Sequence, residues 1–144
     1  MYKKEVFLDQ INVLSNLSGL RILVVDDCED NQFLLSHLLK RKGVLISTAS
    51  NGQEAVEKAL SEKFDVILMD IQMPYMDGLE AQKKIKSSGN PVPIFAVTAS
   101  SQREEKSKIL KAGFAAFISK PLNKDFLFSS ILSVTQKNSE VLNA

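Results

Sequence analysis

From residue 20 onward, short apolar runs alternate five times with stretches of helical periodicity. The runs lie at 22–25, 44–49, 66–69, 92–97 and 115–119. Strands that alternate with helices pair in parallel, and each connecting helix makes a right-handed crossover. This alternation therefore predicts a parallel sheet with helices on both faces. The run at 66–69 is apolar without alternation, which is typical of a strand buried on both faces. The run at 44–49 is more polar and predicts an edge strand.

The helical stretches carry start signals that can be read from the sequence. Asn51 with Glu54, and Asp77 with Glu80, have the spacing of capping boxes, in which the first side chain caps the helix. The stretch 100–113 is mostly polar and has few apolar residues to anchor it. It therefore predicts a helix of low local stability.

Residues 1–19 and 136–144 fall outside the repeats. The first segment carries a helix-like stripe of apolar residues and is predicted to be an N-terminal extension or linker. A native N-terminus, a dimer contact and the remnant of a linker from an upstream domain all fit it. The second segment is polar and is predicted to be a flexible tail. The central domain therefore spans 20–135.

Charge balance and cysteine content exclude several classes of protein. Eighteen basic and 17 acidic residues give a formal net charge of +1, which favours neither direct nucleic-acid binding nor membrane contact. The single cysteine, Cys28, excludes an internal disulfide framework and suits a reducing compartment. No apolar run approaches the ~18 residues of a membrane-spanning helix. A cytoplasmic protein, or a cytoplasmic piece of a larger one, is expected.

Charged and hydroxyl side chains stand at four of the strand ends. Asp26 and Asp27 follow the first strand, Asp70 the third, Thr98 the fourth and Lys120 the fifth. Ligands of open parallel sheets bind outside the carboxyl ends of the strands, so these residues are expected to meet at one edge. Each alone has a simpler explanation, since an acidic pair often lies in a solvated turn. Asp70 alone could be a nucleophile, a metal ligand or a helix cap.

Three carboxylates at one edge require positive charge between them. At ~5 Å and an effective dielectric constant of ~20, each pair repels by roughly 3 kcal/mol. Lys120 supplies one positive charge, and a hard divalent cation with oxygen ligands, for which Mg²⁺ is the natural candidate, would supply more. Such a site suits a phosphoryl group: the cations neutralise its oxygens, Thr98 donates a hydrogen bond, and Asp70 attacks phosphorus in line.

The loops disfavour two other functions of such a sheet. A nucleotide or flavin binder needs a glycine-rich or hydroxyl-rich loop after the first strand, whereas 26–30 reads Asp-Asp-Cys-Glu-Asp. A phosphatase that forms an aspartyl phosphate would need an acid two residues after its nucleophile, and this chain has Gln72 there. Turnover of outside substrates is therefore not expected.

Taken together, these motifs resemble the receiver domain of two-component response regulators. The matching residues are Asp26-Asp27, Met69-Asp70, Met73-Pro74 with Asp77-Gly78, Thr98-Ala99 and Lys120-Pro121, within a stretch from about 19 to 135. The resemblance implies an α/β fold, the flavodoxin-like doubly wound (βα)5 sandwich, whose five-stranded parallel sheet has the order 2-1-3-4-5. It also implies phosphorelay signalling, in which Asp70 takes a phosphoryl group from a phosphohistidine on a histidine kinase or histidine phosphotransfer protein.

The resemblance further implies a metal site with Mg²⁺ as its cofactor. Asp27, Asp70 and the backbone carbonyl of Gln72 would bind the ion, and Asp26 would support it through water. The domain would catalyse only its own phosphorylation and dephosphorylation. Gln72 marks the site as a slow switch rather than a hydrolase.

The remaining implied roles concern the phosphoryl group and the switch. Thr98 and Lys120 would hold the phosphoryl oxygens, and the Lys120–Pro121 peptide bond would be cis. In this family the threonine hydroxyl moves inward on phosphorylation and an aromatic residue of the fifth strand rotates with it. That position is Phe117, which has no hydroxyl to bond outward. The output face, and a candidate homodimer contact, would comprise the fourth helix, the fifth strand and the fifth helix.

The residues at 30–32 and 69–74 are most similar to those of receivers appended to hybrid sensor histidine kinases. The chain would then be part of such a kinase. The alternative is an interaction module that has the same fold but is not controlled by phosphorylation. The complete set of three acids with Thr98 and Lys120 argues against this alternative.

Overall fold

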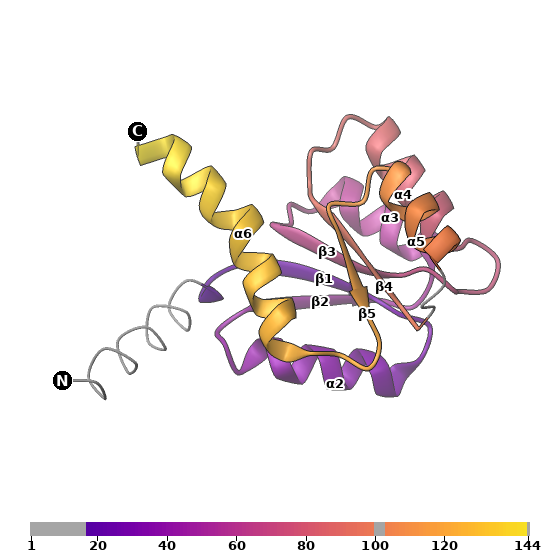
Figure 1. The fold of residues 1–144 in the computed structure, drawn as a ribbon, viewed down its shortest axis with the longest axis horizontal. Coiled ribbons are helices and arrows are strands. Elements are labelled where there is room, and N and C mark those ends of the chain that lie inside the picture. The colour runs from indigo at the N-terminus through magenta and orange to yellow at the C-terminus, as the bar shows by residue number, and fades with distance from the viewer. Residues whose placement is uncertain (1–16, 100–102, 144) are drawn as a thin grey trace.

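The computed structural model describes residues 17–99 and 103–143, in which five strands alternate with five helices (Figure 1). The strands are β1 (Arg21–Val25), β2 (Leu45–Ala49), β3 (Val66–Asp70), β4 (Ile94–Thr98) and β5 (Ala116–Ser119). The helices are α2 (Glu29–Lys40), α3 (Gly52–Ser61), α4 (Gly78–Ser87), α5 (Arg103–Lys111) and α6 (Lys124–Asn143). Residues 1–16, which carry most of the apolar stripe predicted within 1–19, lie outside the described residues.

All strands pair in parallel, in the order β2-β1-β3-β4-β5, which confirms the predicted flavodoxin-like arrangement. β2 is an edge strand, as its polar sequence predicted. The register pairs Val25 of β1 with Met69 of β3, and Asp70 with Val97 of β4. The strands therefore end at nearly the same level, and the residues that follow them share one edge of the sheet.

Two hydrophobic cores enclose the sheet, one on each face (Figure 1). Successive residues of a strand point to opposite faces, so Leu23 of β1 packs with α3, α4 and α5, whereas Val24 packs with α2 and α6. β3 is buried along its whole length, as predicted. This burial places the end of β3 in the middle of the molecule, between two layers of helices.

The helix starts show that the capping residues are separate from the acids at the strand ends. The side-chain oxygens of Asn51 and Asp77 accept hydrogen bonds from the backbone N–H groups of Glu54 (2.8 Å) and Glu80 (2.9 Å). Both predicted caps are confirmed. Because Asp77 caps α4, Asp70 is not needed for that role.

The described structure extends past residues 20–135 at both ends. Leu17 is fully buried in the core under α2 and α6, three residues before the predicted start. At the other end, α6 continues to Asn143 and so includes most of the segment predicted as a tail from residue 136. The segment 124–143 contains neither glycine nor proline, so no residue in it stops a helix that has begun.

Helix α5 is anchored weakly, as its polar sequence predicted. Within α5, Ile109 alone is buried. Its C-terminal end is held from α4, because Nε2 of the buried Gln82 donates a hydrogen bond to the carbonyl oxygen of Ala112 at 2.9 Å. Among the residues that the structure describes, no helix is both long and apolar enough to cross a lipid bilayer.

Candidate functional site

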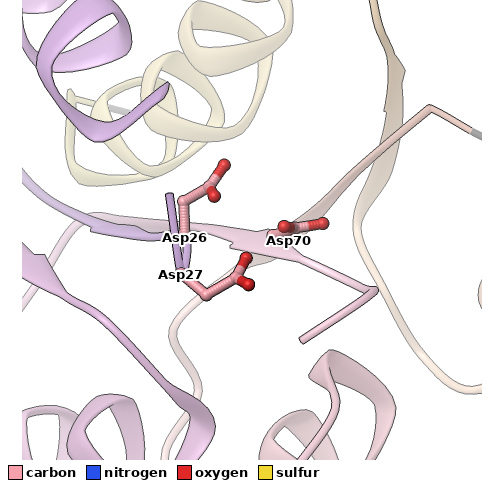
Figure 2. Close-up of side chains that lie close together, drawn as sticks. All are labelled: Asp26, Asp27 and Asp70. Atoms are coloured by element: carbon pink, nitrogen blue, oxygen red, sulfur yellow. The ribbon is translucent and has the colours of Figure 1, made fainter. Parts of the chain in front are cut away.

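Three carboxylates gather at the carboxyl edge of the sheet (Figure 2). Asp26 and Asp27 follow β1, and Asp70 is the last residue of β3. One oxygen from each carboxylate lies within 4.8 Å of the others. Asp26 and Asp70 are buried and Asp27 is exposed, so two of the three acids are largely withdrawn from water.

The carboxylate of Asp26 is held from two sides. The Lys120 ammonium nitrogen lies 3.4 Å from Oδ2, and the backbone N–H of Cys28 donates a hydrogen bond to Oδ1 at 2.9 Å. Lys120 is itself fixed by its backbone, because its N–H donates to the carbonyl oxygen of Thr98 at 2.9 Å. Asp26 is only 5% exposed, so this ion pair offsets part of the lost hydration of the carboxylate.

Asp70 is the acid whose titration the site changes most clearly. It is 7% exposed, and its Oδ1 accepts a hydrogen bond from the backbone N–H of Gln72 at 3.2 Å. Burial raises the pKa of Asp70 from 3.8 to about 6, and the neighbouring charges of Asp26 and Asp27 add to this rise. Lys120 and the Gln72 N–H act in the opposite direction. The carboxyl group is therefore mostly ionised at neutral pH.

The other residues that the sequence placed at this edge lie on β4 and β5. Thr98 is the last residue of β4, is buried, and pairs in register with Ser119 of β5. Phe117 of β5 is partly buried against the core under α3, α4 and α5. The Lys106 ammonium of α5 lies 5.5 Å from the centre of the Phe117 ring. The Lys120–Pro121 peptide bond is cis.

The donor set and its charge fit a hard divalent cation. Three carboxylates and one ammonium leave two negative formal charges at the edge of the sheet, which one divalent ion would balance. All three acids offer oxygen, the ligand atom that Mg²⁺ prefers, and the exposed Asp27 leaves the site accessible to water. The residues present therefore fit a magnesium ion.

Comparison with known proteins identifies the family. The profile described as the response regulator receiver domain matches residues 22–132, which is most of the chain. This chain belongs to that family. Its relatives include the hybrid signal transduction histidine kinase I of Dictyostelium discoideum, 38% identical over 120 residues, and the sensor histidine kinase GacS of Pseudomonas protegens, 34% identical over 120 residues. Both are histidine kinases, in agreement with the predicted similarity to receivers of hybrid sensor kinases.

The matches to these kinases are local. They cover 77% and 80% of this chain but only 7% and 13% of the two kinases. Among solved structures, the receiver domain of the sensor histidine kinase PA1611 from Pseudomonas aeruginosa superposes with a TM-score of 0.77 at 30% identity, covering 83% of this chain and 99% of that one. That structure holds a magnesium ion in its active site cleft. The chemotaxis protein CheY4 of Vibrio cholerae has a TM-score of 0.75 at 32% identity, covering 80% and 98%.

Two further residues of the receiver domain support the acids through contacts that no sequence pattern predicts. Gln32 of α2 donates from Nε2 to the carbonyl oxygens of Asp26 (2.5 Å) and Ala49 (3.1 Å), which ties the acidic loop to the end of β2. At Gly78, a Cβ atom would lie 2.5 Å from the carbonyl oxygen of Asp70, so only glycine allows α4 to start so close to β3. Gly78 belongs to the motif at 73–78 and Gln32 to the stretch 30–32 that resembles receivers of hybrid kinases, but neither pattern predicts these contacts.

Without divalent cations, the receiver domain is expected to lose stability as the pH rises from acidic to neutral. The folded-state pKa of Asp70, about 6, lies above the unfolded-state value of 3.8, so the folded chain holds this proton more tightly. Ionisation of Asp70 therefore lowers the free energy of unfolding by about 3 kcal/mol in total, of which about 2 kcal/mol is lost between about pH 4.5 and 7.5. Above the folded-state pKa the loss is complete.

Urea unfolding in EDTA at these two pH values measures the effect. The Asp70→Asn variant, which lacks the titrating group, is the reference. The free energy of unfolding of the variant minus that of the wild type should increase by about 2 kcal/mol between the two pH values. A difference that stays constant with pH would contradict the raised pKa of Asp70.

Proposed function

We propose that this receiver domain accepts a phosphoryl group on Asp70 from a phosphohistidine of a histidine kinase or a histidine phosphotransfer protein, in a reaction that requires Mg²⁺. The observation that carries the proposal is the convergence of Asp26, Asp27 and Asp70 beside the Lys120 ammonium. Three acids with one lysine are suited to bind a divalent cation and a phosphoryl group together.

The proposed reaction uses the residues already placed at the edge of the sheet. A carboxylate oxygen of Asp70 forms the new O–P bond as the N–P bond of the phosphohistidine breaks, and the electron pair of that bond stays on the imidazole nitrogen. Thr98 and Lys120 hold the phosphoryl oxygens. Asp27, Asp70 and the Gln72 carbonyl, with Asp26 acting through water, would hold Mg²⁺, and the bound ion would supply positive charge to neutralise the phosphoryl oxygens.

Phosphorylation is proposed to change a partner-binding face made by α5, β5 and α6. The weak anchoring of α5, with Ile109 as its buried residue, supports this assignment because loosely held elements move at small energetic cost. Thr98 and Phe117 are the proposed switch residues, and the same face is the proposed contact of a homodimer. In this proposal the receiver domain belongs to a hybrid histidine kinase and works in the cytoplasm.

The test is phosphoryl uptake by the wild-type domain from acetyl phosphate, followed by intact-mass spectrometry. Uptake is expected in Mg²⁺ and not in EDTA, since the site has two negative charges to neutralise before a phosphoryl group can approach. A phosphorylated histidine phosphotransfer protein should act as a faster donor. A wild-type domain that takes up no phosphoryl group from either donor would favour the phosphorylation-independent interaction module.

A further inference from the structure

The loop that leads from Asp70 into α4 contains a strained turn. The backbone N–H of Met76 donates a hydrogen bond to the carbonyl oxygen of Pro74 at 2.9 Å, and the residue between them, Tyr75, has a φ of +68°. An i to i+2 hydrogen bond around a residue with positive φ defines the rarer and strained form of the γ-turn. Tyr75 is the only non-glycine residue with positive φ among those described, and bulky side chains disfavour this conformation.

Close packing on both sides holds this turn in place. A Cβ atom on Gly52 of α3 would lie 2.7 Å from the carbonyl oxygen of Met76, so the loop rests directly on the start of that helix. On the other side, Gly78 allows α4 to start against the back of Asp70. Ile71 and Met73 are buried in the core. The loop therefore has little freedom to relax the turn at its tip.

The side chain at the tip of the loop is not packed against the rest of the domain. Tyr75 has a relative exposure of 103%, the highest of the exposed large hydrophobic side chains in the described structure. Glycine would adopt the positive φ without strain, and the ring of Tyr75 is not buried in exchange. Neither packing nor backbone conformation explains a tyrosine at this position. Strain of this kind is found at functional sites, where other interactions compensate for it.

We infer that Tyr75 is an aromatic contact for the protein that delivers the phosphoryl group to Asp70. The inference rests on the proposed function. A histidine side chain is short, and Asp70 is only 7% exposed. A phosphohistidine therefore reaches Asp70 only when the donor surface around the histidine contacts the loops at this edge of the sheet. The loop that carries Tyr75 starts at Asp70 and projects from the edge where the strands end (Figure 1).

The chemistry of tyrosine indicates the surface that this donor presents. Tyrosine buries a large ring at little cost in side-chain entropy and offers a hydroxyl for one hydrogen bond, and it is enriched among the residues that dominate binding energy. The donor surface next to the phosphohistidine is therefore apolar, with a hydrogen-bonding group at its rim. A small donor such as acetyl phosphate presents no protein surface to Tyr75 while it reacts with Asp70.

The experiment compares two donors on the same variants. A panel of phosphorylated histidine phosphotransfer domains is screened against the wild type, and the fastest is used beside acetyl phosphate. With the protein donor below saturation, Tyr75→Gly is expected to reduce the transfer rate about tenfold, and Tyr75→Phe to restore it to within about threefold, because the ring supplies most of the contact. With acetyl phosphate, all three proteins are expected to react at the same rate.

The matched control is Leu45→Thr. Leu45 is also exposed, but it opens β2 at the opposite, amino-terminal edge of the sheet. This variant is expected to react like the wild type with both donors. Thermal unfolding adds an independent readout: Tyr75→Gly should raise the midpoint by about 2–4 °C, because glycine relieves the strained φ.

Each result of the comparison decides the inference. Tyr75→Gly that slows transfer from the protein donor alone supports it. Tyr75→Gly that leaves both rates unchanged, or reduces both equally, overturns it. Labelling of the wild type by acetyl phosphate but by no phosphohistidine protein overturns the donor contact and leaves Asp70 as an acceptor. A wild type that neither donor labels overturns the proposed function, and the inference with it.

Discussion

The Asp70→Asn variant is expected to take up no phosphoryl group from acetyl phosphate or from a phosphohistidine protein. An amide oxygen lacks the negative charge that attacks phosphorus, while its shape is nearly that of the carboxylate, so the fold should persist. The variant retains an oxygen that can accept the hydrogen bond from the Gln72 N–H. Intact mass after incubation with donor and Mg²⁺ measures the loss directly.

The control for this variant lies at the other end of the same strand. Asp65 precedes β3, and its carboxylate accepts a hydrogen bond from the backbone N–H of Arg21 at 2.8 Å. Asp65→Asn keeps an acceptor for this bond and should be phosphorylated like the wild type. If Asp70→Asn were labelled at the wild-type rate, another residue would have to be the acceptor, and the site as proposed would be wrong.

The second large effect is expected when the lysine charge is removed. Lys120→Met keeps most of the length of the side chain but deletes the ammonium that lies 3.4 Å from Oδ2 of the buried Asp26. The phosphoryl-transfer rate should fall at least about 100-fold, which is the usual effect of removing one group that stabilises the transition state electrostatically. The initial rate of labelling by acetyl phosphate at a fixed Mg²⁺ concentration measures this change.

The same substitution is expected to destabilise the fold at neutral pH. Asp26 would remain buried without this cation, and the pKa of Asp70, which Lys120 lowers, would rise further. Breaking a buried ion pair costs several kcal/mol, and because Lys120 is partly exposed we expect a loss of about 2 kcal/mol in the free energy of unfolding.

The control is Lys124→Met, which replaces an exposed lysine at the start of α6. It should change neither the phosphoryl-transfer rate nor the free energy of unfolding. Urea unfolding at neutral pH in EDTA measures the change in stability. A Lys120→Met domain that is as stable and as reactive as the wild type would show that the ion pair to Asp26 is incidental.

Much of the fold could be predicted from the sequence because the relevant signals are local. The apolar run that ends at Asp70 indicated a buried central strand, and the polar run at 44–49 indicated an edge strand. Both are found in the structure. The caps at Asn51 and Asp77 were predicted equally well, since a capping residue and its partner are three residues apart.

The features that were missed depend on contacts between distant segments. Leu17 lies in a stretch outside the strand–helix repeats, yet it is buried in the core under α2 and α6. The resemblance at 30–32 gave Gln32 no structural role, but its amide joins the ends of β1 and β2. The conformation of Tyr75 carried no signal either, because its neighbours hold the turn through contacts with α3 and α4.

The order of the elements, the faces of the strands and the polar residues that follow them can be read from the amino-acid sequence. These properties repeat with the period of a strand or helix and can be read within a few residues. The interactions among those polar residues depend on the folded arrangement of the chain. The ion pair between Asp26 and Lys120 joins residues 94 positions apart, and the raised pKa of Asp70 and the strained turn at Tyr75 arise from burial and packing that the whole fold imposes. Electrostatic and steric terms depend on distance in space, and separation along the chain does not set that distance.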